Sequence, residues 1–201
     1  LESRGIVPNA TFQRTSFRVK VDADLTDKLK ASMSANYVNS GGDRIQRGSN
    51  IKGVMLGLLR NTPTFDMGNG KVGQEAADDP DTYVLANGSQ RSYRAGVYDN
   101  PYWTANKNPS TDNVNRVIGY TSLSYEFTDW LNLSYKVGID HYTDRRNSAL
   151  DINPGRSAGS VNQDFYSNRD INSDLLLTFR KDLSETLGFS ATVGGNSFST
   201  D

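Results

Sequence analysis

Apolar and polar residues alternate along three stretches of the chain, and a short turn divides each stretch. The turns are residues 25–29, 127–131 and 183–187, with the sequences LTDKL, FTDWL and LSETL. On both sides of every turn, apolar residues fall mainly on odd positions and polar residues on even positions. Successive side chains of a β-strand point to opposite faces, so constant parity predicts strands with one apolar face. The pattern therefore predicts three antiparallel hairpins.

The alternation also sets the bounds of six expected strands. They form the pairs Phe17–Leu25 and Leu29–Tyr37, Val117–Phe127 and Leu131–His141, and Ile171–Leu183 and Leu187–Gly195. A soluble antiparallel β-sandwich alternates in the same way and is the main alternative. Its strands are usually about 5–6 residues long, whereas these are about 9–13. Strand length therefore favours a membrane-spanning sheet.

Charge in the expected strands is almost confined to even positions. These positions hold Arg18, Lys20, Asp22, Asp24, Lys30, Glu126, Lys136, Asp140, Asp174, Arg180 and Asp182. The odd positions hold only Lys181, two residues from a turn, where its long stem can reach a polar boundary. A Lys or Arg at the middle of a lipid-facing strand costs about 2–4 kcal/mol, and much less near an interface. This distribution favours an odd face in contact with lipid.

The two faces give two sets of expected site residues. The residues expected to face lipid are Leu133, Val137, Leu175 and Leu177. The residues expected to face the lumen are Arg18, Lys20, Asp22, Lys136 and Asp174. For the charges at positions 18 to 24, pairing with neighbouring strands is the default alternative to lining a lumen.

The expected connections differ strongly in length between the two ends of the strands. Three-residue turns close each hairpin, whereas long loops of residues 38–116 and 142–170 join one hairpin to the next. Aromatic residues lie near both strand ends, as in the interfacial belts of membrane proteins. Short turns on one side and long loops on the other are typical of outer-membrane barrels. We therefore expect an all-β fold, an antiparallel transmembrane β-barrel segment with long extracellular loops.

Composition changes this picture little. The chain has 201 residues, no Cys and a formal net charge of -1. Its longest apolar stretch, residues 53–59, is far shorter than the roughly 20 residues of a membrane-spanning helix. The near-neutral charge gives no support for nucleic-acid binding. The chain begins in mid-pattern, so we expect it to be a piece of a longer protein.

The first long loop contains one expected helix, near residues 50–59. Ser49 and Asn50 are candidate capping residues, and Thr62-Pro63 would end the helical segment. Its apolar positions follow helical spacing at Ile51, Val54, Met55, Leu58 and Leu59.

Two groups in this loop are candidate binding residues. Tyr98, Tyr102 and Trp103 could form a stacking platform for a sugar or peptide, or they could anchor the loop. Asp78, Asp79 and Asp81 are hard oxygen ligands, so calcium is conceivable, but a solvated acidic loop is the favoured interpretation.

The pattern gives no support for an enzyme. His141 is the only His, and an interfacial ring is the better interpretation for it. The sequence 68–70 (GNG) indicates a turn, because no Lys-Ser/Thr follows it as in a phosphate-binding loop. We therefore predict no catalytic residue, no metal site and no cofactor.

Several strings together resemble one family. They are 5–9 (GIVPN) with 12–14 (FQR), 48–51 (GSNI) leading to 58–63 (LLRNTP) and 65–66 (FD), 99–103 (DNPYW) with 106–109 (NKNP), 115–119 (NRVIG), 125–131 (YEFTDWL) and 135–140 (YKVGID). In order and spacing they resemble the SusC/RagA family of TonB-linked outer-membrane transporters. The resemblance covers nearly the whole chain, although each string alone is modest.

The resemblance implies more than the pattern does. Family members are 22-stranded barrels with an N-terminal plug, and they import glycans or peptides across the outer membrane of Gram-negative Bacteroidota with energy from TonB. A SusD-like surface lipoprotein closes over the barrel. The whole chain, 1–201, would then be part of a barrel domain whose even face lines the lumen or packs on a plug. No plug or TonB box is recognisable here. A passive porin or secretion-channel barrel is the second alternative.

Overall fold

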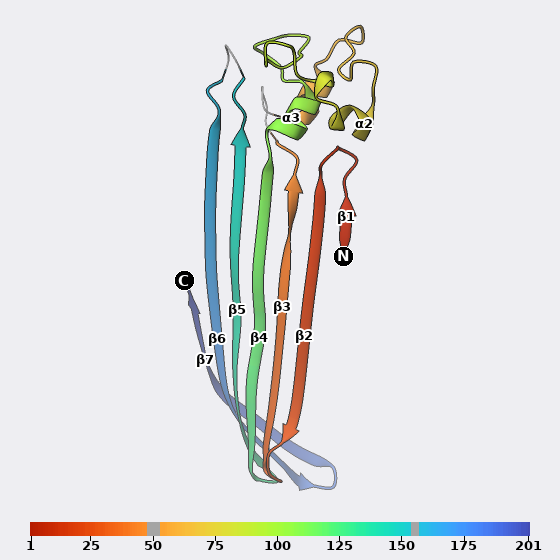
Figure 1. Cartoon of the computed structure of the whole chain (residues 1–201). Helices are drawn as coiled ribbons and strands as arrows, with labels where there is room; N and C mark the ends of the chain where they lie inside the picture. The colour runs from red at the N-terminus through yellow and green to blue at the C-terminus, as the bar shows by residue number, and fades with distance from the viewer. Residues whose placement is uncertain (48–52, 154–156) are drawn as a thin grey trace. The chain divides into compact units, whose positions relative to one another are not determined.

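The chain folds into a single seven-stranded antiparallel sheet with a few short helices (Figure 1). The structure is a computed structural model that describes residues 1–47, 53–153 and 157–201. The strands lie in sequence order from β1 to β7, so each strand pairs with its neighbours in the chain. The sheet is not closed into a barrel, because β1 and β7 are its two outer strands.

The elements alternate between long strands and short helices. The strands are β1 (Glu2–Arg4), β2 (Thr11–Asp24), β3 (Leu29–Arg44), β4 (Ser110–Thr128), β5 (Leu131–Leu150), β6 (Ser160–Ser184) and β7 (Leu187–Thr200). The helices are α1 (Val54–Leu59), α2 (Gly73–Asp78), η1 (Pro80–Thr82) and α3 (Pro101–Lys107). Within the described ranges, every helix is too short to cross a membrane as an apolar span.

The chain divides into two compact units. The first unit comprises residues 1–14, 40–113 and 144–165, and it contains all of the helices. The second unit comprises residues 15–39, 114–143 and 166–201, and it consists of strands and their turns.

The three predicted hairpins are present as β2–β3, β4–β5 and β6–β7. In the first turn, the Thr26 hydroxyl accepts hydrogen bonds from the backbone N–H groups of Lys28 and Leu29, at 3.3 and 3.0 Å. A Thr side chain that bonds to the backbone two or three residues ahead is a common way to fix a tight turn. The local sequence therefore accounts for where this hairpin reverses.

The sequence prediction was wrong about strand number and strand length. It missed β1, a three-residue strand that pairs with β2 through Glu2↔Gln13, Ser3↔Phe12 and Arg4↔Thr11. The six expected strands are all present but run 14–25 residues. The segment between β3 and β4 shrinks from the expected 38–116 to 45–109.

The second expected loop, 142–170, was the larger error, because most of it is strand. Only residues 151–159 lie between β5 and β6. The extensions are polar on both faces, so they lack the alternation on which the prediction relied. They form strand because backbone pairing needs no apolar side chain, and polar contacts such as Gln163 to Asn147, at 2.8 Å, join them.

The predicted parity is confirmed in the hairpin β6–β7, from Asp170 to Asp182. Across β6 and β7, Leu175 pairs with Gly195, Leu177 with Val193 and Phe179 with Ala191, all at odd positions. Even positions also pair with each other, as in Asp174↔Asn196 and Thr178↔Thr192. One register shift lies between Asp182 and Ser184, next to the turn. The odd positions, which hold most of the apolar residues, and the even positions therefore lie on opposite faces of this hairpin. Leu176 and Phe198 are apolar residues on the even face, and Lys181 is a charge on the odd face.

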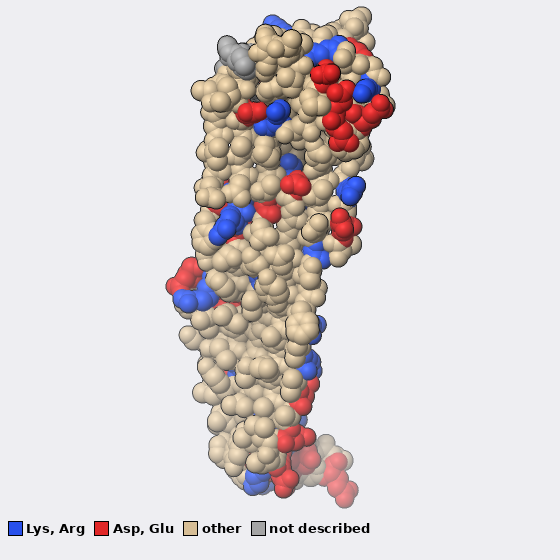
Figure 2. All heavy atoms as spheres, in the orientation of Figure 1, with Lys and Arg blue, Asp and Glu red and all other residues tan. Residues whose placement is uncertain are grey.

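The odd face of the second unit is exposed although it is apolar. Exposed odd residues include Phe17, Val21, Met33, Leu123, Tyr125, Phe127, Leu175, Leu177, Phe189 and Val193. Figure 2 shows few charged residues over the lower part of the strands, apart from those along one side of the view. Folded soluble monomers rarely expose a contiguous apolar surface of this kind. The described residues of the chain leave this sheet face uncovered.

Gly41 allows β3 and β4 to approach closely, which leads to a first testable prediction. A Cβ at position 41 would lie 2.3 Å from the carbonyl oxygen of Asp112, whereas one at Gly195 would have no atom within 4 Å. We expect Gly41→Ala to lower the free energy of unfolding by about 1–3 kcal/mol, the usual cost of overpacking. Gly195→Ala is the matched control and should change it by less than about 0.5 kcal/mol. Urea titration of both variants measures the difference, and equal effects would contradict it.

Candidate functional site

The first unit contains the buried apolar core of the described chain. Its fully covered apolar side chains are Val54, Met67, Ala76, Ala77, Tyr83 and Trp103, all in the segment 45–109 between β3 and β4. The helices of this segment have at most seven residues, so tertiary contacts must stabilise them. Residues 53–109 therefore form a small core within the first unit, and the candidate site is built on it.

Asn100 joins three parts of this core. Its side chain is fully buried, donates from Nδ2 to the Met67 carbonyl at 3.1 Å, and accepts at Oδ1 from the Tyr102 N–H at 2.8 Å. The second bond caps the N-terminus of α3, the role for which Asn is favoured. The Asn100 backbone N–H donates to Gln90 Oε1 at 2.8 Å, and Gln90 Nε2 donates to Asp99. A buried polar network thus positions α3.

Asp66 organises a tight turn over residues 66–70, where the sequence predicted one. Its carboxylate accepts the N–H groups of Gly68, at 2.8 Å, and Gly70, at 2.5 Å. Asn69 and Gly70 have positive φ angles, of 51° and 88°, which this turn requires. The Gly68 bond, followed by the Gly70 bond, holds the pKa of Asp66 below its usual range.

The lowered pKa predicts a local pH dependence. A carboxylate whose pKa falls on folding stabilises the fold above its unfolded-state pKa, and that contribution is lost as pH falls through the lower folded pKa. We therefore expect the Gly68 and Gly70 amide resonances to shift at a pH below the ordinary range of an Asp side chain. An NMR titration measures the shift. Asp66→Asn, which keeps one acceptor oxygen and does not titrate, should abolish it, and an unchanged titration in that variant would refute the assignment.

The acidic residues at positions 78, 79 and 81 do not form a ligand cluster in the structure. Asp79 forms an ion pair with Lys71 at 2.8 Å, and Asp78 accepts a hydrogen bond from Gln74 at 2.8 Å. Acidic side chains gather over α2 in Figure 2. Among the described residues, no group of three or more His, Asp or Glu side chains is placed to hold a metal ion. These contacts favour the solvated acidic loop.

The three candidate stacking residues do not form one platform. Trp103 is buried, with 3% of its surface exposed. The Tyr102 hydroxyl accepts the Gly73 N–H at 3.2 Å, and Tyr98 stacks on Tyr93 with ring centroids 6.3 Å apart. These residues anchor the segment onto itself, which was the simpler of the two interpretations.

The expected helix near 50–59 is present in part. Helix α1 covers Val54–Leu59, and the sequence-predicted cap at Ser49-Asn50 and the apolar Ile51 lie outside the described residues. Val54 is buried, whereas Met55, Leu58 and Leu59 are exposed. The predicted apolar side of this helix is therefore only partly covered.

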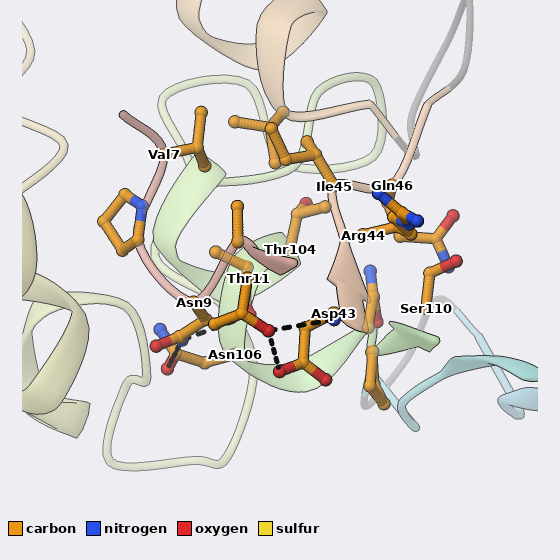
Figure 3. A pocket seen from close by; sticks show the side chains of 16 residues that line it. Val7, Asn9, Thr11, Asp43, Arg44, Ile45, Gln46, Thr104, Asn106 and Ser110 are labelled. Atoms are coloured by element: carbon orange, nitrogen blue, oxygen red, sulfur yellow. Dashed lines mark hydrogen bonds between the residues drawn. The ribbon is translucent and has the colours of Figure 1, made fainter. Parts of the chain in front are cut away.

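Two adjoining cavities lie where segments of the first unit converge. The first has a volume of about 350 Å³, and residues 7–11, 43–46, 54, 104–106 and 108–110 line it (Figure 3). Thr11 donates to the Asp43 carboxylate at 2.9 Å, and Asn9 donates to Asn106 at 2.8 Å. The hydroxyl of Thr104, a residue 1% exposed that lines this cavity, has no hydrogen-bond partner within the described chain.

The second cavity, of about 700 Å³, shares residues 10–11, 43–46 and 110 with the first. It carries charge of both signs, from Arg44, Arg47, Arg146, Asp43, Asp112 and Asp164. Arg44 holds Asp112 through two hydrogen bonds, of 2.5 and 2.8 Å, and Arg146 pairs with Asp144 at 2.6 Å. Both volumes are within the range of about 300–1,000 Å³ typical of small-ligand pockets. The two cavities together form the candidate site.

The residues expected to face a lumen lie in the second unit and mostly contact one another or a neighbouring strand. Lys20 pairs with Asp22 at 2.9 Å, and Asp22 accepts a hydrogen bond from Ser32 at 2.6 Å. Lys136 lies over the Tyr120 ring, 4.6 Å from its centroid. Asp174 accepts from Asn196 at 2.7 Å, and Arg18 is exposed. These contacts agree with pairing on an even face, and whether that face lines a lumen stays a prediction.

The residues expected to face lipid show graded exposure. Leu175 and Leu177 are exposed, and Leu133 and Val137 are half-buried. The His141 ring is half-buried, with Nδ1 2.9 Å from the Asn168 carbonyl oxygen. Contact of these residues with lipid or an interface stays a prediction.

Sequence reasoning missed the residues that form the cavities and the buried polar network. Asn9, Asp43, Gln90 and Thr104 belong to separate parts of the chain, and no spacing connects them. The string 99–103 drew attention to Asn100 only as part of a resemblance. A local signal does exist for the cap of α3. Asn100 stands immediately before Pro101, and Asn is favoured at the capping position while Pro is common at the first helical position.

Comparison with known proteins does not assign the chain to a family. No protein-family model matches it, and a search of curated proteins finds no significant match.

Proposed function

We propose that this chain forms part of the wall of a TonB-dependent outer-membrane importer of glycans or peptides. The observation that supports the proposal best is the exposed apolar face of the second unit, whose opposite face carries the charges. Lipid is a cover that matches a face of this kind, since hydrocarbon accepts apolar side chains and rejects charged ones. The strings that resemble the SusC/RagA family favour the same assignment.

Strand length and open edges agree with this role. A strand crosses a bilayer with about 9–11 residues, and β2 to β7 have 14–25. Hydrogen-bonding groups left unpaired at a sheet edge cost several kcal/mol each in hydrocarbon, so the sheet requires further strands at both outer edges. The resemblance supplies a number for the complete barrel, 22 strands.

The mechanism that follows contains no bond chemistry in this chain. The segment 45–109 faces outward and meets substrate beneath a SusD-like surface lipoprotein. A plug domain fills the lumen and contacts the charged even face. TonB withdraws or rearranges the plug, and the glycan or peptide passes along that face into the periplasm. No nucleic acid or cofactor takes part.

Membrane fractionation and uptake measurements test the proposal. The natural protein should appear in the outer-membrane fraction of a Gram-negative bacterium, and depletion of TonB should abolish uptake of its substrate. A protein recovered as a soluble, cooperatively folding carbohydrate-binding module would refute the barrel. Uptake that continues without TonB would refute energy coupling and favour a passive porin or secretion channel.

A further inference from the structure

The lining of the two cavities discriminates between the two substrate classes of the proposed importer. The first cavity combines apolar side chains such as Val7, Ile45 and Val54 with neutral polar groups and with Asp43 and Arg44, which it shares with the second cavity. The second carries three Arg and three Asp side chains. A partly apolar pocket beside a pocket richer in charge of both signs matches a molecule that is apolar in one part and zwitterionic in another.

Two charges of the second cavity are available to a ligand. Arg44 is engaged by Asp112, and Arg146 by Asp144. Neither Arg47 nor Asp164 forms an ion pair with any other residue in the described ranges. An Arg side chain binds a carboxylate with two parallel hydrogen bonds, and an Asp side chain accepts hydrogen bonds from an ammonium group. These two residues therefore offer partners for the two ends of a free peptide.

The buried hydroxyl of Thr104 indicates a polar contact in the first cavity. Buried polar groups are almost always hydrogen-bonded, so an unpaired hydroxyl beside a cavity offers a hydrogen bond to a molecule that occupies the cavity. Figure 3 places Thr104 among the lining side chains, near Thr11 and Ile45. A main-chain N–H or C=O group of a peptide would satisfy this hydroxyl.

The same lining offers little to a neutral glycan. Sugar rings pack their C–H faces on exposed aromatic rings, and Phe12 is the one aromatic residue in the described lining of the two cavities. The guanidinium of Arg44 covers that ring, 5.2 Å from its centroid. Trp103 and Tyr98, the other aromatic candidates, are engaged within the segment itself.

We propose that the two cavities bind a short peptide with free termini. An uncharged side chain enters the first cavity beside Thr104, while Arg47 binds the terminal carboxylate and Asp164 the terminal ammonium group. The proposal rests on the proposed import function, and it selects the peptide from its two substrate classes.

Calorimetric titration of the natural protein, purified in detergent, tests the inference with three probes. The probes are the tripeptide Ala-Leu-Ala, the same tripeptide acetylated and amidated at its ends, and maltohexaose. We expect the free tripeptide to bind, the capped form to bind at least about tenfold more weakly, and the oligosaccharide not to bind. Binding of maltohexaose without tripeptide binding, equal binding of both peptides, or binding of no probe would overturn the inference.

Two variants locate the binding. Arg47→Gln should weaken tripeptide binding about tenfold, whereas Arg60→Gln, at an exposed Arg outside both cavities, should not. Thr104→Val should weaken binding about three- to tenfold and leave thermal stability equal or higher, because it removes an unpaired buried hydroxyl. Tripeptide binding that is unchanged in both cavity variants would refute the site.

The two proposals can fail separately. Tripeptide binding that depends on Arg47 and Thr104, in a protein absent from the outer membrane, would refute import and retain the peptide site. TonB-dependent uptake of oligosaccharide, with no tripeptide binding, would retain import and refute the peptide site.

Discussion

Leu177→Arg is expected to prevent this protein from assembling in a membrane. Leu177 lies on the odd face of β6, seven residues before the strand ends at Ser184, is 42% exposed and pairs with Val193 of β7. If lipid covers this face, an Arg here places a charge in hydrocarbon at a cost of about 2–4 kcal/mol. This cost is a large fraction of the free energy of unfolding of most proteins, which is about 5–15 kcal/mol. Leu133→Arg on β5 should act in the same direction.

Adjacent even positions provide the matched controls. Thr178 pairs with Thr192 on the opposite face, and its hydroxyl lies 3.2 Å from that of Thr192. Thr178→Arg adds the same charge one residue away, where it meets polar neighbours, and Ser134→Arg does so beside Leu133. The fraction of folded protein in lipid vesicles, measured for all four variants, tests the faces. Equal folded fractions for the odd-face variants (Leu133→Arg and Leu177→Arg) and the even-face variants (Ser134→Arg and Thr178→Arg) would refute the face assignment.

Asn100→Leu is expected to unfold the segment 45–109 while leaving the hairpins intact. The change removes the bond to the Met67 carbonyl and the cap on the Tyr102 N–H, and it leaves both partners buried or half-buried without a bond. A buried group that loses its partner costs about 1–3 kcal/mol. The two losses together should destabilise the segment by about 2–5 kcal/mol, enough to unfold a local unit before the rest of a protein.

Hydrogen exchange separates this local effect from a global one. Amides of α3 and of residues 83–91 should exchange faster in Asn100→Leu, while amides of β6 and β7 keep their protection. Asn87→Leu is the control, because Asn87 is exposed and its amide oxygen bonds only within its own turn, to Ser89. Loss of protection throughout the sheet would show that the segment is not a separate unit, and unchanged exchange in α3 would remove Asn100 from its central role.

The hairpins could be predicted because their information is local. A turn sequence and a parity rule involve residues a few positions apart, and the observed register of β6 and β7 preserves that parity up to Asp182. The extensions of β5 and β6 could not be predicted, because apolar and polar residues do not alternate in them. The same is true of β1, whose three residues are all exposed and are held by pairing with β2.

The candidate site could not be predicted for a different reason. Its lining combines a turn near Asn9, the end of β3 and the end of α3, which only tertiary packing brings together. Residue type was also misleading. Trp103 suggested an exposed platform, but the structure uses it as core, because a large aromatic side chain gains most free energy when it is buried.

The core between β3 and β4 also affects the sequence of events in folding. Hairpins β2–β3 and β4–β5 close through short turns and can form early, whereas pairing of β3 with β4 must first close the long segment between them. Closure entropy grows with the length of a flexible loop, but a loop that has already condensed around its own core brings its ends together in advance. Arg44 and Asp112, bonded at 2.5 Å, mark that meeting point. Asn100→Leu should therefore slow the rate at which the two hairpins join, beyond its effect on equilibrium stability.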